Sequence, residues 1–191
     1  MFFDRRKKVE MVTEDSALPG RDTAIAVAEK HCVLPASMVN VPEGYTEIQF
    51  AMGCFWGAER RFWQQEDVYS TAVGYAGGYT LNPSYEEVCS GLTGHTEVVR
   101  VVYKDDADVL QQLLKVFWEA HDPTQGMRQG NDIGSQYRSA LFASNSTQLE
   151  QAQKSADNYQ TALADGGIKE TITTQIQMAA NFYYAEDYHQ Q

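Results

Sequence analysis

The sequence has few basic residues and no long apolar run, and each shortage excludes a class of protein. Its 191 residues contain 15 Lys and Arg against 26 Asp and Glu, which gives a formal net charge of -11. Because nucleic-acid binding depends on Lys and Arg placed against phosphates, this balance argues against a nucleic-acid partner. No stretch approaches the roughly 20 apolar residues that a membrane-spanning helix needs, so we expect no membrane partner either.

The sequence also lacks the apolar stretch of a secretory signal. Its basic cluster, residues 5–8 (RRKK), lies close to the start, but the residues that follow it, VEMVTED, are charged and polar. A signal peptide would need an apolar region at that point. We therefore expect a cytoplasmic protein.

Cysteine is scarce as well. Cys32, Cys54 and Cys89 are too few and too scattered for a disulfide framework, and their odd number leaves one thiol over. This favours thiol chemistry, with an inert buried cysteine as the ordinary alternative. The four histidines show no paired ligand spacing and no Cys-x-x-Cys accompanies them, so we expect no metal site; they are His31, His95, His121 and His189.

The pattern of apolar residues predicts an N-terminal extension over residues 1–44 and one catalytic domain over residues 45–191. Strands are expected at 45–52, 69–76, 96–103, 137–143 and 170–178. Helices are expected at 55–66, 85–88, 108–120 and from a capping box at residues 147–150 to Gly166. This order predicts an α+β fold, a split β-α-β (ferredoxin-like) two-layer sandwich with N- and C-terminal additions and helices on one face.

Cys54 lies between the end of an expected strand and the start of an expected helix. Backbone N–H groups of the first helical turn and the helix dipole should lower the pKa of a thiol there and favour the thiolate. Gly53 and Gly57 leave room for a ligand, and Phe55 and Trp56 supply an aromatic wall. The ordinary alternative is a small apolar residue buried in a tight turn.

The segment around Cys54, GCFWGAE, is similar to the signature of the A-type peptide methionine sulfoxide reductases, which act on the S epimer. Four further blocks resemble this family in the family's order, and together they extend from about Tyr45 to Gln191: GYAGG at 74–78, NPSYEEV at 82–88, GHTE at 94–97 and DIGSQYRS at 132–139. The resemblance implies an enzyme that reduces free and peptide-bound methionine S-sulfoxide, repairs oxidised proteins and needs no cofactor.

The resemblance also implies roles for seven residues. Cys54 would attack the sulfoxide sulfur and become a sulfenic acid, and Glu97 would be the general acid. Tyr85 and Tyr137 would bind the sulfoxide oxygen. The substrate-binding residues would be Phe55 and Trp56, which hold the S-methyl group, and Asp132, which borders the pocket.

One of these roles has independent support from the pattern of residues. By strand alternation Glu97 shares the more apolar face of its strand with Val99, Val101 and Tyr103, so burial should raise its pKa. The ordinary alternatives remain a solvent-facing glutamate, tyrosines that only pack, and Asp132 as a turn residue.

Regeneration of the thiol needs a second thiol. Many members of this family carry resolving cysteines in a Gly-rich tail beyond a Tyr-His-Gln like residues 188–190, and this sequence ends at Gln191 without them. We expect thioredoxin or another thiol reductant as partner, with Cys89 and Cys32 as weaker internal candidates.

Two other functions fit the isolated cysteine. One is a cysteine hydrolase in which His95 acts as the base. The other is a redox-sensing thiol protein without turnover.

Overall fold

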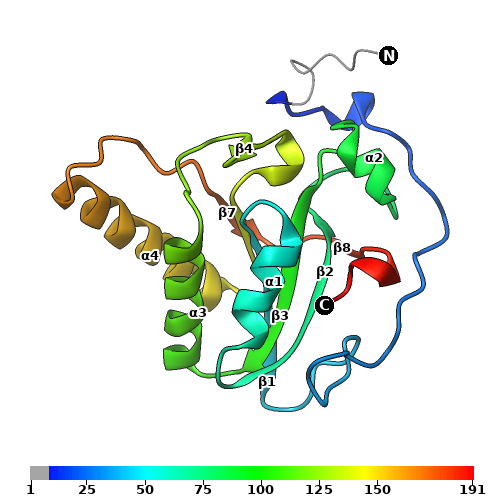
Figure 1. The fold of residues 1–191 in the computed structure, drawn as a ribbon, viewed down its shortest axis with the longest axis horizontal. Helices are drawn as coiled ribbons and strands as arrows, with labels where there is room; N and C mark the ends of the chain where they lie inside the picture. Colours follow the sequence, from blue (N-terminus) through cyan, green and yellow to red (C-terminus); the bar gives the residue numbers. More distant parts are fainter. Residues whose placement is uncertain (1–8) are drawn as a thin grey trace.

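A six-stranded sheet forms the centre of the structure, a computed structural model that describes residues 9–191 (Figure 1). The basic cluster at residues 5–8 lies outside the described residues. Neighbouring strands pair antiparallel except β6 and β7, which pair parallel. The strand order is β7 (Gln175–Met178), β6 (Ala140–Ala143), β1 (Tyr45–Ala51), β3 (Thr96–Lys104), β2 (Val68–Ala76) and β8 (Phe182–Tyr184).

Helices α1 (Phe55–Trp63), α3 (Ala107–Ala120) and α4 (Ser146–Asp165) cover one face of the sheet, while the short helix α2 (Tyr85–Cys89) follows β2 (Figure 1). The core on this face is aromatic. Phe50 of β1 stacks on Phe62 of α1 with ring centroids 4.6 Å apart, and Phe117 of α3 lies 5.3 Å from Phe50. The chain therefore has a mixed α/β fold whose nucleophile-bearing helix is fixed by the core.

The second face of the sheet is covered by other parts of the chain. Small residues surround Phe142 there, with Phe182 and Ala179 packed against them. The Arg100 guanidinium lies 2.5 Å from a Glu47 carboxylate oxygen and donates to the Met38 carbonyl at 2.7 Å. The N-terminal extension thus closes part of this face.

Several boundaries differ from those expected. The strand expected at 137–143 starts at Ala140 because Ser135–Tyr137 forms a 3-10 turn, and the strand expected at 170–178 starts at Gln175. The first helix ends at Trp63 instead of residue 66. Helix α4 begins at Ser146, since Asn145 caps it by accepting the Gln148 N–H, so the capping box at 147–150 was wrong.

Three short strands were not expected: β8, and the hairpin of β4 (Arg128–Gln129) with β5 (Asp132–Ile133). Both lie in segments without a clear alternation of apolar residues. Among residues 9–191, no helix is both long enough and apolar enough to span a membrane.

Candidate active site

Cys54 is the N-cap residue of α1 and is exposed. Its side chain makes no capping hydrogen bond, but the backbone N–H groups of Trp56 and Gly57 act on its sulfur to lower the pKa, as the helix-start position predicts. Gly53 before it has φ 85°, and a Cβ on this residue would lie 2.7 Å from the Gln129 side chain. A glycine is therefore required where the chain turns from β1 into α1.

The pKa of Cys54 is nevertheless raised, contrary to the expectation of a lowered value. Partial burial is the largest cause, and the negative charges of Glu97 and Asp132 add to it. The N–H groups of Trp56 and Gly57 act in the opposite direction but do not outweigh these effects. The partial burial of Cys54 and the two nearby carboxylates both depend on the fold and cannot be seen in the sequence around Cys54.

Glu97 lies at the start of β3 with only 2% of its surface exposed. Its Oε2 accepts the backbone N–H of Phe55 at 3.0 Å, which joins it directly to the residue after Cys54. Burial raises the pKa of Glu97 from 4.5 to about 7, the Phe55 N–H opposes this, and Asp132 adds to it. The expected raised pKa is thus confirmed, and Glu97 can hold a proton near neutral pH.

Tyr85 and Tyr137 lie close to the same groups. Burial is the main cause that raises the pKa of both tyrosines. The Tyr85 side chain hydrogen-bonds Cys89, while Glu97, Cys89, Asp132 and Cys54 all raise the pKa of Tyr137 through their charges. The fold therefore gathers both tyrosines, both carboxyl groups and Cys54 at one place.

Phe55 and Trp56 differ in exposure. Phe55 is buried in the core, whereas 57% of the Trp56 surface is exposed. The Trp56 indole Nε1–H donates to His189 Nδ1 at 3.2 Å, and the His189 ring lies 5.3 Å from Phe55 and 4.6 Å from Tyr85. Trp56 therefore presents an exposed apolar surface next to Cys54, and His189 holds the indole ring in place.

His189 and Glu186 are site residues that the sequence reasoning missed. Glu186 accepts the Tyr75 hydroxyl and the backbone N–H of Tyr85, both at 2.9 Å. Both residues lie in a short segment after β8 without periodicity. The Tyr-His-Gln resemblance at residues 188–190 was the only signal for this segment, and it carried no role.

His95 cannot be the base that a hydrolase would need. It is 1% exposed, its Nδ1 accepts the Gly78 N–H at 3.1 Å, and its Nε2 lies 2.8 Å from the Thr80 carbonyl oxygen. Both ring nitrogens are therefore occupied by backbone groups. Within residues 9–191, no three His, Cys, Asp or Glu side chains are grouped so that they could hold a metal ion.

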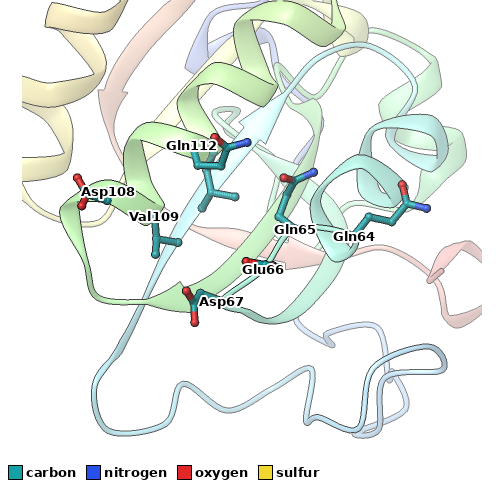
Figure 2. Close-up of a pocket in the computed structure, with 8 residues that line it drawn as sticks. Gln64, Gln65, Glu66, Asp67, Asp108, Val109 and Gln112 are labelled. Atoms are coloured by element: carbon teal, nitrogen blue, oxygen red, sulfur yellow. The ribbon is translucent and has the colours of Figure 1, made fainter.

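A separate pocket lies at the opposite end of α1 from Cys54 (Figure 2). Polar side chains from the loop after α1 and from the first turns of α3 line it, among them Gln64, Gln65, Asp67 and Asp108. The pocket contains no thiol and no aromatic ring, so it does not share the chemistry of the Cys54 site.

Comparisons with known proteins agree on one family. The family model described as peptide methionine sulfoxide reductase matches residues 46–191. The peptide methionine sulfoxide reductase MsrA of Cronobacter sakazakii is 56% identical over 190 residues, which cover 100% of this chain and 88% of that protein. The chain is thus similar to that enzyme over its whole length.

Solved structures give the same likeness. The methionine sulfoxide reductase A of Corynebacterium diphtheriae is 41% identical with a TM-score of 0.88, over 95% of this chain and 89% of that one. Mxr1 from Saccharomyces cerevisiae, solved in complex with Trx2, shares the fold at 24% identity and a TM-score of 0.54, over 82% of this chain and 89% of that one.

Proposed function

The chain belongs to the peptide methionine sulfoxide reductase family, and from this premise we propose that Cys54 is its nucleophile and Glu97 its general acid. The protein is a peptide-methionine (S)-S-oxide reductase, an oxidoreductase that repairs oxidised methionine. The observation that carries the proposed roles is the buried Glu97 carboxyl group. It accepts the N–H of the residue after Cys54 and has a pKa near 7.

The proposed reaction moves one oxygen atom between two sulfur atoms. Cys54 attacks the sulfoxide sulfur as a thiolate and forms a bond between the two sulfur atoms, while Glu97 donates a proton to the sulfoxide oxygen. The hydroxyl group then passes to the Cys54 sulfur, and both the S–O bond of the substrate and the new bond between the sulfur atoms break. The oxygen ends as the hydroxyl group of a Cys54 sulfenic acid, and methionine leaves as a thioether. The thiol proton of Cys54 replaces the proton that Glu97 donates, so the step balances: Cys–SH and the sulfoxide become Cys–S–OH and the thioether, and Glu97 is protonated again.

The raised pKa of Cys54 fits this order of events. A neutral sulfoxide enters more readily beside a neutral thiol and a neutral carboxylic acid than beside two anions, because paired anions must be desolvated together. The N–H groups of Trp56 and Gly57 then stabilise the thiolate when the thiol gives up its proton.

The remaining side chains would bind the substrate. The hydroxyl groups of Tyr85 and Tyr137 stay protonated because their pKa values are raised, so both can donate to the sulfoxide oxygen. Phe55 and Trp56 would hold the S-methyl group, a contact of the sulfur–aromatic type. Asp132 would border the pocket from β5.

Two finer statements about the architecture belong to the same proposal. We assign the catalytic domain to residues 45–191 and the extension to residues 1–44, which the family match at 46–191 supports. We also describe the centre of the domain as a split β-α-β fold. The strand order β6-β1-β3-β2, with α1 after β1 and α3 after β3, supports that description.

Regeneration would use an external thiol reductant of the thioredoxin kind, and oxidised proteins or peptides would be the substrates. The complex of Mxr1 with Trx2 supports the first part by likeness of fold. A reductant of this kind also agrees with a cytoplasmic location.

A single-turnover assay without reductant tests the proposed nucleophile. The wild-type protein should form about one methionine per chain from a peptide S-sulfoxide, since one thiol accepts one oxygen. Cys54→Ser should form none, because a hydroxyl group is a far weaker nucleophile at sulfur. Methionine is counted by chromatography, and dimedone labelling with intact mass locates the sulfenic acid.

Cys89→Ser and Cys32→Ser are the matched controls, and both should still form methionine. Substantial product from Cys54→Ser would reject the nucleophile assignment. A disulfide in place of the dimedone adduct in the wild type would identify an internal resolving cysteine, and the two control variants would show which one it is.

A further inference from the structure

The C-terminal strap, residues 185–191, crosses β2 and ends on α1. Gln190 fixes it to β2, since its side chain accepts the Val73 N–H at 2.9 Å and donates to the Val73 carbonyl at 3.0 Å. The strap carries Glu186, which holds the backbone of Tyr85, and His189, which accepts the Trp56 indole N–H. The position of this strap therefore sets the position of two proposed substrate-binding side chains.

The end of the strap is bound to a buried carboxylate on the nucleophile-bearing helix. Glu59 of α1 is 1% exposed and accepts the backbone N–H of Gln191 at 2.9 Å and its side-chain amide at 3.0 Å. The Thr71 hydroxyl donates to the same carboxylate at 2.8 Å. A buried carboxylate is tolerated only with such partners, so Glu59 stabilises the strap end against α1.

Residues 28–38 of the N-terminal extension, here called the brace, contact the strap from outside. The Ala28 N–H donates to Asp187 Oδ1 at 2.8 Å, the Cys32 N–H donates to Gln191 Oε1 at 3.0 Å, and the Gln191 amide lies 3.2 Å from Met38 Sδ. Figure 1 shows the extension in blue passing outside the red C-terminal segment. Ala28 and Cys32 of the brace thus hold the two ends of the Asp187–Gln191 stretch.

A directed chain of hydrogen bonds fixes the brace itself. His31 Nδ1 accepts the N–H groups of Val33 and Leu34, at 3.0 and 2.9 Å, so Nε2 must carry the ring proton. Nε2 then donates to the Thr71 hydroxyl at 3.0 Å, which in turn donates to Glu59. The brace, through Thr71, and the strap, through Gln191, are therefore linked to the same buried carboxylate.

We infer that the brace is a positioning element of the active site: it holds the strap, and the strap holds Trp56 and Tyr85 beside Cys54. The inference rests on the proposed role of Trp56 in binding the sulfoxide. It gives residues 28–38 a function in substrate binding although none of them belongs to the Cys54 site.

The test removes the strap side chains that the brace contacts and leaves the Cys54 site residues intact. In the full chain, Asp187→Ala deletes the acceptor of the Ala28 N–H, and Gln191→Ala deletes the acceptor of the Cys32 N–H together with its amide contacts to Met38 and Glu59. Asp187→Ala alone keeps the Glu59 contact and should change the same two measurements in the same direction. We expect the half-saturating sulfoxide concentration in the single-turnover assay to rise about three- to tenfold, the effect of one lost hydrogen bond. The Trp56 indole N–H resonance, assigned with Trp56→Phe, should shift because the hydrogen bond to His189 changes.

Two matched variants separate positioning from general stability. Asp187→Asn, with Gln191 unchanged, keeps an oxygen that accepts the Ala28 N–H. This variant should show the Trp56 resonance and the half-saturating sulfoxide concentration of the wild type. Ser37→Ala alters a brace hydroxyl whose partner is Val39, within the extension, so it should change neither the resonance nor the kinetics.

The inference is overturned if the double variant loses stability but keeps the Trp56 resonance and the half-saturating concentration of the wild type. It is also overturned if the resonance moves and the kinetics do not. Failure of the proposed substrate-binding role would look different, because Trp56→Ala would then bind the sulfoxide as tightly as the wild type.

Discussion

Two buried glutamates show how single residues acquire different chemistry in one fold. Glu59 and Glu97 are 1% and 2% exposed, and both have a raised pKa. Three donor groups from Thr71 and Gln191 reach Glu59, whereas Glu97 accepts the backbone N–H of Phe55 and faces the charge of Asp132. The three donors oppose the effect of burial on the pKa of Glu59 without outweighing it, and they tie this side chain to the C-terminal segment. Glu97 has one such donor and a neighbouring negative charge, so its carboxyl group can hold a proton that can be donated.

The raised pKa of Glu97 makes the stability of the protein depend on pH. The folded-state pKa is about 7 and the ordinary value is 4.5, so the unfolded chain ionises first and the folded state loses stability as pH rises through this window. Glu97→Gln cannot ionise. The free energy of unfolding of the variant, relative to that of the wild type, should therefore rise by up to about 3 kcal/mol between pH 4 and pH 8, at about 1.4 kcal/mol per pKa unit.

Urea unfolding at several pH values measures this difference, with the exposed Glu150→Gln as control. The same Glu97→Gln protein should form methionine more slowly in single turnover, by a factor of about 10² or more for a lost general acid. A stability difference that is flat across pH would show that Glu97 is not the group with the raised pKa.

At the scale of elements, local patterns predicted the type of each long helix and strand. Alternation placed the strands of residues 45–52 and 96–103 within one residue of the observed ends. It also placed Glu97 on the same face as Val99 and Val101, which belong to the core under the helices. The short strands β4, β5 and β8 were missed because two or three residues carry no period. The contacts of Glu186 and His189 depend on distant segments, which no local pattern encodes.

The residue that caps α4 is not the one that the sequence motif at residues 147–150 predicted. Asn145 accepts the Gln148 N–H at 2.9 Å, whereas Thr147 was expected to be the cap. Asn145→Ala should lower the free energy of unfolding by about 1 kcal/mol, since it leaves a backbone N–H without its acceptor. Thr147→Ala should change it by less than about 0.5 kcal/mol, as an exposed helical position would.

Urea denaturation of the two single variants decides between the caps. The opposite ranking, with the larger loss for Thr147→Ala, would restore the capping box at residues 147–150 and move the helix start.

At the scale of the whole molecule, the sheet has two cores of different construction. Three helices supply the large side chains of the first, among them Phe62 and Phe117. On the second face Phe142 is the large side chain among alanines and a valine, covered by Phe182 and Ala179 from the C-terminal part of the chain. A glycine at 77 is needed for this packing, because a Cβ there would lie 2.5 Å from the Phe142 ring.

If the second face of the sheet is a true core, Phe142 should contribute as much to the free energy of unfolding as a large side chain packed between the sheet and the helices. Phe142→Ala should lower the free energy of unfolding by about 3–5 kcal/mol, the range for a buried Phe whose cavity is not refilled. Leu92→Ala, at a leucine that is 38% exposed, should cost less than about 1 kcal/mol in the same urea titration. A small loss for Phe142→Ala would mean that water reaches this face, and that the chain ends do not close it as a core.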